Sequence, residues 1–321
     1  MRIFCGMEAT DPKSLIKAIG RGKTLFRDLT MDEMRRALAM ILDGTFTQAQ
    51  TGAFLQALRI KETSADEVLA ALEGLSGFQV PMPDPVGEWP LVVNVAFDSR
   101  RKATVLSVLA ARLLASTGLA SPCLVWSPCL NAGIGRPLDL TLEVAEGILG
   151  LDAEIPSYSI TDLVPALAGL DALRRELGFR SVLNTLEKLV RPWKTAPVVL
   201  GIAHDTFRTR LAEVLGRDGS NSGAIVQGNH GTCDLGLGEE PTTVIRYGQV
   251  VAEDSVSRKD FPWEATSAIH LLASKDQWPT WLSDRGSPLW NAVRIQASFL
   301  LSVARPDLGM DDCIALVNAK A

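Results

Sequence analysis

Three consecutive cations, Arg100-Arg101-Lys102, follow a short apolar segment and have the residue types of an anion site. Leu91–Val95 is rich in valine and predicts a buried parallel strand, and Ala103–Ser116 has the composition of a helix. Proteins with alternating strands and helices bind ligands where a strand ends and a helix begins. A diphosphate site would have glycines in this turn, so that backbone amides could close on the phosphate oxygens. The sequence therefore predicts a turn that attracts phosphate by charge.

A second cationic turn lies near the start of the chain. Gly20-Arg21-Gly22-Lys23 places two cations between or beside glycines, and Arg27 follows a few residues later. The amides and side chains of such a turn can meet a phosphate group. The alternative is a helix C-cap followed by solvated cations. From the turn alone, the helix cap is the favoured interpretation.

A third cationic segment, Asp171–Lys194, carries a net charge of +3 in a chain whose net charge is −5 and whose pI is about 5.4. Its cations are Arg174, Arg175, Arg180, Lys188, Arg191 and Lys194. An acidic chain has no global signature of nucleic-acid binding, so any site for a polyanion must be a local patch.

Two other groups of residues have the types found in metal sites and at catalytic nucleophiles. Asp205, Asp234, Glu239 and Glu240 suggest a metal site, and Cys233 near His230 suggests a nucleophile. Spacing alone supports neither, since no partner that would orient a base is identifiable. We therefore predict no catalytic residue and no metal ligand. Four tryptophans of the C-terminal third offer stacking surfaces for bases, although core or dimer contacts are the favoured interpretation: Trp263, Trp278, Trp281 and Trp290.

Five cysteines without paired spacing fit a reducing compartment better than a disulfide framework. No apolar run approaches the ~18 residues that a membrane-spanning helix needs. We expect a cytoplasmic protein with no membrane contact.

The elements that must position these cations follow two patterns. The first 77 residues predict four helices: Asp11-Pro12 begins one, Gly20 ends it, and three capping boxes follow at Thr30…Glu33, Thr47…Gln50 and Ser64…Glu67. Pro81–Pro90 carries four prolines and predicts a linker. From Leu91 the chain alternates short apolar runs with helices, which indicates a mainly parallel sheet covered by helices.

The expected fold class is thus α/β, with a small α-helical domain and a large α/β domain built on a mainly parallel central sheet. We expect residues 1–80 to form the helical domain, with residues 165–195 packed onto it. Residues 81–164 and 196–321 would form the large domain.

The sequence resembles anthranilate phosphoribosyltransferase over nearly its whole length, and this resemblance implies the discontinuous small domain. The residues that carry it are Arg174–Ser181 with Asn184, which are similar to the family's RRELGxRTxxN segment, Val199–Ile202, Ala212–Leu215, and Gly228 with Gly231. The resemblance also implies a phosphoribosyl diphosphate site between the two domains.

Four elements of the family's active site are altered. Its GTGGD phosphate loop is replaced by Val95–Ser99, and its KHG(N)R segment by Ser127–Asn131. The magnesium-binding Asp-Glu pair falls at Cys233-Asp234, and sulfur is a poor ligand for Mg²⁺. The substrate-binding His-His-Pro falls at Leu163-Val164-Pro165. The scaffold is kept while the transferase chemistry is degraded.

The chain is also similar to the YbiB-like proteins, homodimeric homologues of that transferase that bind nucleic acid with little sequence preference. The matching residues are Ile19–Lys23, Arg27–Leu29, Ala57–Lys61, Arg101-Lys102 and Gly178–Ser181. This resemblance implies a protein without catalysis or cofactor that binds DNA or RNA in a cationic cleft between its domains. The expected phosphate-binding residues are Arg21, Lys23, Arg27, Arg100, Arg101, Lys102, Arg174, Arg180 and Lys188.

The alternative is a phosphoribosyltransferase that uses Mg²⁺ and phosphoribosyl diphosphate on an aromatic or heterocyclic acceptor. In either case, the apolar faces of residues 31–43 and 48–60 exceed what one short bundle buries. We therefore expect a homodimer formed through the helical domain, as the resemblance also implies.

Overall fold

A computed structural model of the chain describes residues 11–22, 25–96, 106–130, 155–204, 207–220, 222–228, 231–248, 251–267 and 277–320. The chain forms two compact units. The helical unit comprises Met1–Val80 and Val164–Leu189, and the sheet unit comprises Pro81–Leu163 and Val190–Ala321. From the sequence we expected 165–195 to accompany the first 80 residues, and the structure groups 164–189 with them.

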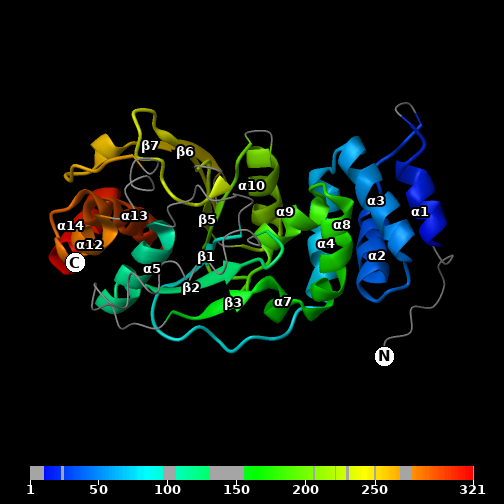
Figure 1. Cartoon of the computed structure of the whole chain (residues 1–321), viewed down its shortest axis with the longest axis horizontal. Helices are drawn as coiled ribbons and strands as arrows, with labels where there is room; N and C mark the ends of the chain where they lie inside the picture. Colours follow the sequence, from blue (N-terminus) through cyan, green and yellow to red (C-terminus); the bar gives the residue numbers. More distant parts are fainter. Residues whose placement is uncertain are drawn as a thin grey trace. The chain divides into compact units, whose positions relative to one another are not determined.

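The helical unit contains helices from both of its chain segments (Figure 1). They are α1 (Pro12–Ile19), α2 (Met31–Leu42), α3 (Gln48–Lys61), α4 (Ala65–Ser76), the 3-10 helix η1 (Pro165–Leu170), α8 (Asp171–Leu177) and α9 (Val182–Leu189). Helix α2 packs on α4, and α1 on α3, while α9 packs on α4. Met34, Leu38, Phe54 and Leu58 are at most 1% exposed, so the predicted apolar faces form the core of this unit.

Local sequence signals fix the ends of these helices. Asp11 caps α1 and Gly20 ends it, as predicted. Thr30, Thr47 and Ser64 each form a complete capping box with the residue three positions later. A cap of this kind supplies acceptors for amides that have no partner within the helix. All three predicted boxes are confirmed.

The sheet unit is built on seven strands in the order β3-β2-β1-β4-β5-β6-β7. Their bounds are β1 Pro90–Asn94, β2 Ser121–Trp126, β3 Ser157–Ser159, β4 Val198–Gly201, β5 Gly223–Val226, β6 Thr242–Tyr247 and β7 Ala252–Val256. The first five strands pair in parallel, and β6 and β7 are antiparallel additions at one edge. The predicted mainly parallel α/β architecture is confirmed.

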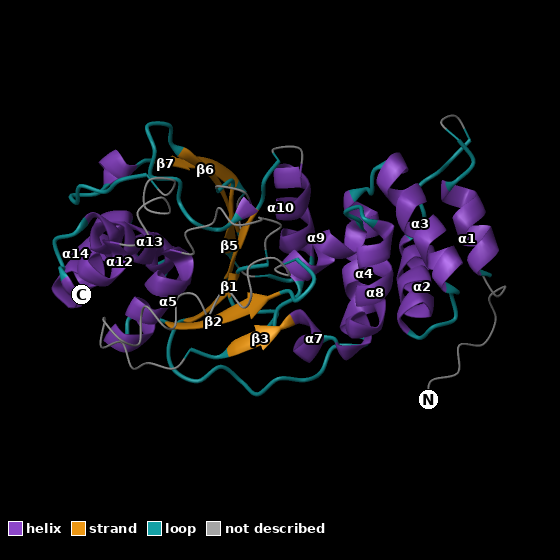
Figure 2. Cartoon of the chain, in the orientation of Figure 1, coloured by secondary structure: helices purple, strands orange, loops and turns teal. Residues whose placement is uncertain are grey.

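Helices cover both faces of this sheet (Figure 2). Helices α5 (Leu106–Thr117) and α13 (Pro288–Ala304) pack against each other on one face, and α10 (Arg208–Arg217) lies against β5 and β6 on the other. The remaining helical elements are α7 (Ile160–Leu163), η4 (Arg258–Asp260), α12 (Trp278–Ser283) and α14 (Met310–Lys320). The strands bury valine, leucine and isoleucine on both faces, as expected for a parallel sheet.

Two strands were not predicted. β3 has only three residues, too few for a periodic signal, and β7 is an edge strand whose first four residues, Ala252–Ser255, are exposed. The predicted helix Leu138–Leu149 lies outside the described residues. Within the described part of the chain, no helix is long and apolar enough to cross a membrane.

Candidate functional site

Two exposed arginines and an aromatic ring come together in the helical unit, from α3 and from the connection between α8 and α9. The Arg59 guanidinium carbon lies 5.9 Å from the centroid of the Phe179 ring, and Arg59 Nη1 donates a hydrogen bond to the Arg180 carbonyl oxygen. Gly178 ends α8 with φ 65°, a left-handed conformation that turns the chain at little steric cost. We call Arg59, Phe179 and Arg180 the arginine–phenylalanine cluster.

Hydrogen bonds at the start of α9 hold this connection in place. The Ser181 amide donates to Asn184 Oδ1 at 2.8 Å, and the Leu183 amide donates to Ser181 Oγ at 3.3 Å. Ser181 is buried, while Arg180 beside it is exposed. The cluster therefore presents positive charge beside a partly buried aromatic ring, on a backbone that is locally fixed. Guanidinium groups bind phosphate oxygens, and aromatic rings stack on bases.

Arg21 extends the positive charge at the end of α1. Gly20 caps that helix through its amide, which donates to the Ile16 carbonyl oxygen at 2.8 Å, and Arg21 is exposed directly after it. A Cβ added to Gly20 would lie 4.0 Å from Ala57 Cβ, so this end of α1 lies against α3, the helix that carries Arg59. The turn is thus a helix cap that also presents a cation. Lys23 lies outside the described residues.

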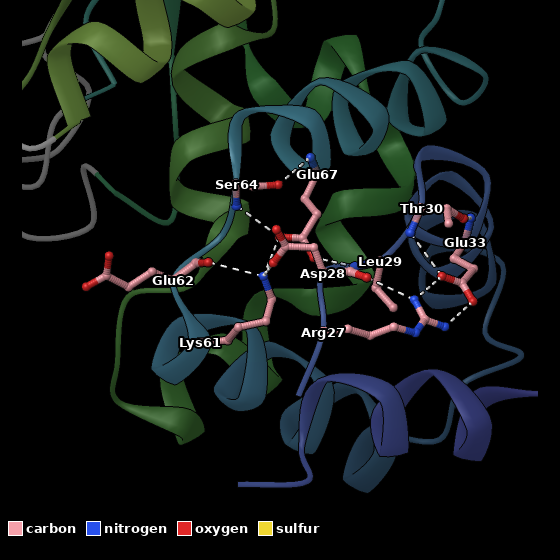
Figure 3. A network of polar contacts seen from close by, with 9 residues as sticks. All are labelled: Arg27, Asp28, Leu29, Thr30, Glu33, Lys61, Glu62, Ser64 and Glu67. Atoms are coloured by element: carbon pink, nitrogen blue, oxygen red, sulfur yellow. Dashed lines mark hydrogen bonds and ion pairs between the residues drawn. The ribbon is translucent and has the colours of Figure 1, made fainter. Parts of the chain in front are cut away.

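Arg27 is engaged by a carboxylate (Figure 3). Its two terminal nitrogens each lie 2.6 Å from one oxygen of Glu33, and Glu33 also accepts the Thr30 amide in the capping box. The hydrogen bond with Glu33 raises the pKa of Arg27, and the hydrogen bond from Arg27 lowers the pKa of Glu33 to about 2. Arg27 remains about half exposed, at 52%. A phosphate contact by Arg27 would have to compete with this pair.

This pair predicts a small dependence of stability on pH. Because the folded pKa of Glu33 is about 2 and its ordinary value is 4.5, the stabilisation is fully present above pH 4.5 and is lost as pH falls toward 2. Glu33→Gln should therefore cost no more than about 1 kcal/mol at pH 7, since a surface pair is screened by solvent. Denaturant titrations should show that the difference in free energy of unfolding between wild type and Glu33→Gln is smaller at pH 3 than at pH 7. Glu62→Gln is the control. If the difference between wild type and Glu33→Gln is the same at pH 3 as at pH 7, the ion pair with Arg27 is not what lowers the pKa of Glu33.

A buried polar network ties the same loop to α3 and α4 (Figure 3). Lys61 Nζ lies 2.6 Å from Glu67 Oε2 and 2.5 Å from Asp28 Oδ1, and the other Glu67 oxygen accepts the Leu29 amide at 2.9 Å. The Lys61 and Glu67 side chains are 1% and 0% exposed. The matched segments Arg27–Leu29 and Ala57–Lys61 thus meet in a network that holds the fold together. Arg59 and Ile60 are the members of the second segment that are exposed, and Arg59 is the cation.

Two other predicted phosphate ligands are buried. Arg174 makes two hydrogen bonds to the Glu187 carboxylate, at 2.5 and 3.0 Å, and the two side chains are 4% and 2% exposed. Lys188 is 8% exposed. A buried guanidinium that is paired with a carboxylate on both terminal nitrogens has a structural role, so we leave Arg174 and Lys188 out of the candidate site.

The predicted turn of the sheet unit, Arg100–Lys102, lies outside the described residues and stays a prediction. The described chain resumes after this turn at Leu106, the first residue of α5. Asp234 is 1% exposed, and its Oδ1 accepts hydrogen bonds from Ser107 N at 2.9 Å and Ser107 Oγ at 2.6 Å. The Asp234 carboxylate therefore accepts both hydrogen bonds of Ser107 in the first turn of α5.

The described residues do not fit the magnesium site that the family resemblance implies. The two positions expected to supply carboxylates are Cys233 and Asp234. Cys233 offers a buried thiol, and Asp234 already accepts two hydrogen bonds through one oxygen. Within the described residues, no group of three or more His, Cys, Asp or Glu side chains is arranged to hold a metal ion.

Sequence reasoning did not include Arg59 and Phe179 among the site residues, although both lie in segments that carried the resemblance. Arg59 is separated from Arg180 by 121 residues. The sequence offered one signal, the position of Arg59 directly after the apolar Leu58 at the end of α3. In the structure Leu58 is buried, and Arg59 and Ile60 are exposed. That signal identifies an exposed cation but not its neighbour.

Comparisons with known proteins agree with this architecture. Residues 13–76 match the family model described as "Glycosyl transferase family, helical bundle domain". The chain is 31% identical over 254 residues to anthranilate phosphoribosyltransferase of Chloroflexus aggregans, covering 74% of each chain. It is 27% identical over 326 residues to the uncharacterized protein YbiB of Escherichia coli, covering 96% of this chain and 99% of that one. The crystal structure of anthranilate phosphoribosyltransferase from Thermus thermophilus has the same fold, with a TM-score of 0.74 at 20% identity and coverage of 96% of this chain and 94% of that one.

A helical bundle of this type joined to a mainly parallel sheet places the protein in the class of glycosyl transferase homologues. Within that class, the chain belongs to the anthranilate phosphoribosyltransferase family.

Proposed function

We propose that this protein binds the phosphate backbone of DNA or RNA, with weak sequence preference and without catalysis. The observation that carries the proposal is the arginine–phenylalanine cluster, in which two exposed arginines, Arg59 and Arg180, share one short stretch of surface with an aromatic ring. Arg21 adds charge at the end of α1. Arg27 and Arg174 of the same unit are paired with carboxylates, whereas Arg59 and Arg180 are exposed beside an aromatic ring.

The chemistry of the cluster favours a single-stranded or flexible ligand. Guanidinium contacts to phosphate supply affinity but carry no sequence information. Base stacking on an aromatic ring such as Phe179 is tolerant of sequence, because every base has a flat face. The net charge of −5 means that the whole protein does not attract polyanions, so binding depends on this local patch.

The experiment is a titration of fluorescent oligonucleotides at several salt concentrations with the Arg59→Glu/Arg180→Glu variant. We expect weaker binding to every sequence by a similar factor. The slope of log affinity against log salt should also flatten by about 0.7 for each lost contact to a single strand. Both side chains are exposed, so the variant should fold.

Lys13→Glu is the matched control, since Lys13 is an exposed cation of the same unit outside the cluster. It should change affinity only slightly, through long-range charge. The proposal fails if wild type does not bind below about 50 mM salt, where counterion release favours association. It also fails if the double variant keeps the wild-type salt slope.

The alternative is a phosphoribosyltransferase, which is favoured by the 31% identity to the Chloroflexus aggregans enzyme. Calorimetry with phosphoribosyl diphosphate, with and without Mg²⁺, separates the two functions. Submillimolar binding that requires Mg²⁺ would favour the enzyme, whereas oligonucleotide binding without it favours the proposal.

The homodimer also stays a prediction, in line with the exposure of Leu25 and Ile60 at 69% and 71%. A light-scattering mass near the 34.6 kDa of one chain would contradict it.

A further inference from the structure

Two arginines lie over the rings of two tryptophans at α13, in the sheet unit. The Arg285 guanidinium carbon lies 5.7 Å from the Trp290 ring centroid, and that of Arg294 lies 5.9 Å from Trp290 and 5.7 Å from Trp263. Trp290 and Arg294 are one helical turn apart on α13, which places their side chains on the same face. Arg285 is exposed and Arg294 is half-buried. Cation–π contact explains how the guanidiniums are held.

Within the part of the chain that the structure describes, neither of these guanidiniums is paired with a carboxylate. Among the residues that the structure describes, no carboxylate forms an ion pair or hydrogen bond with Arg285 or Arg294. Asp284, the acidic residue next to Arg285 in the chain, accepts the Gly286 amide through Oδ1 at 2.9 Å. Arg294 Nε is buried and has no hydrogen-bond partner in the described part of the chain.

This arrangement is electrostatically unfavourable without an anion. Burial, and then the positive charge of Arg285, lower the pKa of Arg294, so the two like charges act on each other. The first turn of α13 has no acidic residue, and the amino end of a helix adds partial positive charge. Like charges in a partly desolvated position normally have a counter-charge.

We propose that Arg285 and Arg294 bind the phosphate group of a phosphate ester. Two guanidiniums carry two positive charges, and a phosphate monoester carries about −1.5 to −2 at pH 7, whereas a single carboxylate would leave one charge uncompensated. Guanidinium also matches phosphate through paired N–H donors. This site is separate from the arginine–phenylalanine cluster, because it belongs to the sheet unit and shares no residue with that cluster.

The test is calorimetry of the full chain with inorganic phosphate, at constant ionic strength and with acetate as the competing anion. Wild type should bind phosphate with a Kd on the order of 1 mM, as expected for a small anion held by two guanidiniums, and should bind acetate more weakly. Arg285→Gln should weaken phosphate binding roughly tenfold, because it removes one charge-assisted contact. Since Arg285 is exposed, this variant should fold.

Arg210→Gln is the matched control. Arg210 also lies over an aromatic ring of the sheet unit, 5.6 Å from the centroid of Phe207, and among the described residues no second guanidinium lies over that ring. The proposal is overturned if phosphate does not bind up to about 20 mM, well above the expected Kd. It is also overturned if Arg285→Gln and Arg210→Gln weaken binding equally. Arg294→Lys, which keeps the charge but loses the planar donors, should also bind phosphate less tightly.

Two further ligands distinguish the source of the phosphate. Competition by a nucleoside 5′-monophosphate supports a site for a phosphate monoester. Equal competition by an oligonucleotide without terminal phosphates, whose phosphodiesters each carry one charge, would overturn the match of two guanidiniums to a monoester. Failure of the nucleic-acid proposal would leave the inorganic phosphate result unaffected, because the two experiments use different variants and different probes.

Discussion

Glu67→Ala is expected to destabilise the helical unit by about 3–5 kcal/mol, the cost of leaving a buried charge without its partner. The variant removes the carboxylate that pairs with Lys61 Nζ at 2.6 Å, in a position where the Lys61 side chain is 1% exposed. It also removes the acceptor for two backbone amides, those of Leu29 and Ser64, each at 2.9 Å. Asp28 remains near Lys61, but its side chain is 61% exposed, so it compensates only in part.

Glu73→Ala is the control for this experiment. Glu73 lies on the same helix α4 and pairs with Arg35 at 2.5 Å, yet its side chain is 35% exposed. A screened pair of this kind contributes no more than about 1 kcal/mol. Native-state hydrogen exchange of α3 and α4 in the full chain should separate the two variants, because it reports the helical unit by itself. Equal loss of protection in both would show that the buried network does not hold the unit together.

Local signals explain why the helix ends were predictable. Thr30, Thr47 and Ser64 each lie three residues from their capping partner, so both halves of a capping box are visible in the sequence. Strands β1, β2, β4, β5 and β6 were predictable for a similar reason, since each is a short, mainly apolar run. The three residues of β3 have no such pattern. The exposed edge strand β7 has no such pattern.

The candidate site was harder to predict because its parts are distant in sequence. Glu67 was visible as a capping residue, but its second oxygen binds the Leu29 amide, 38 residues earlier, and no local pattern shows that contact. Arg59 meets the backbone of Arg180 across 121 residues. A cationic segment in the sequence therefore says how much charge is present, but only the packing of α3, α8 and α9 determines which charges face solvent.

Arg174 is the clearest case of a predicted phosphate ligand that packing buries. Its replacement gives the second large expected effect on stability. Arg174→Met is expected to destabilise the helical unit by about 3–5 kcal/mol, because it leaves the Glu187 carboxylate buried without its cation. The pair is held by two hydrogen bonds, at 2.5 and 3.0 Å, and Glu187 is 2% exposed. Arg175→Met is the control: the neighbouring arginine is 66% exposed and lies 3.9 Å from Asp171, so its loss should be nearly neutral.

The same two variants test whether Arg174 touches a ligand. We expect Arg174→Met, at a temperature where it is still folded, to keep the wild-type dependence of oligonucleotide affinity on salt. If it is instead as stable as Arg175→Met and its salt slope flattens by about 0.7, the loss of one single-strand phosphate contact, then Arg174 binds nucleic acid. The buried pair with Glu187 would then open on binding, and Arg174 would join Arg59 and Arg180 in the site.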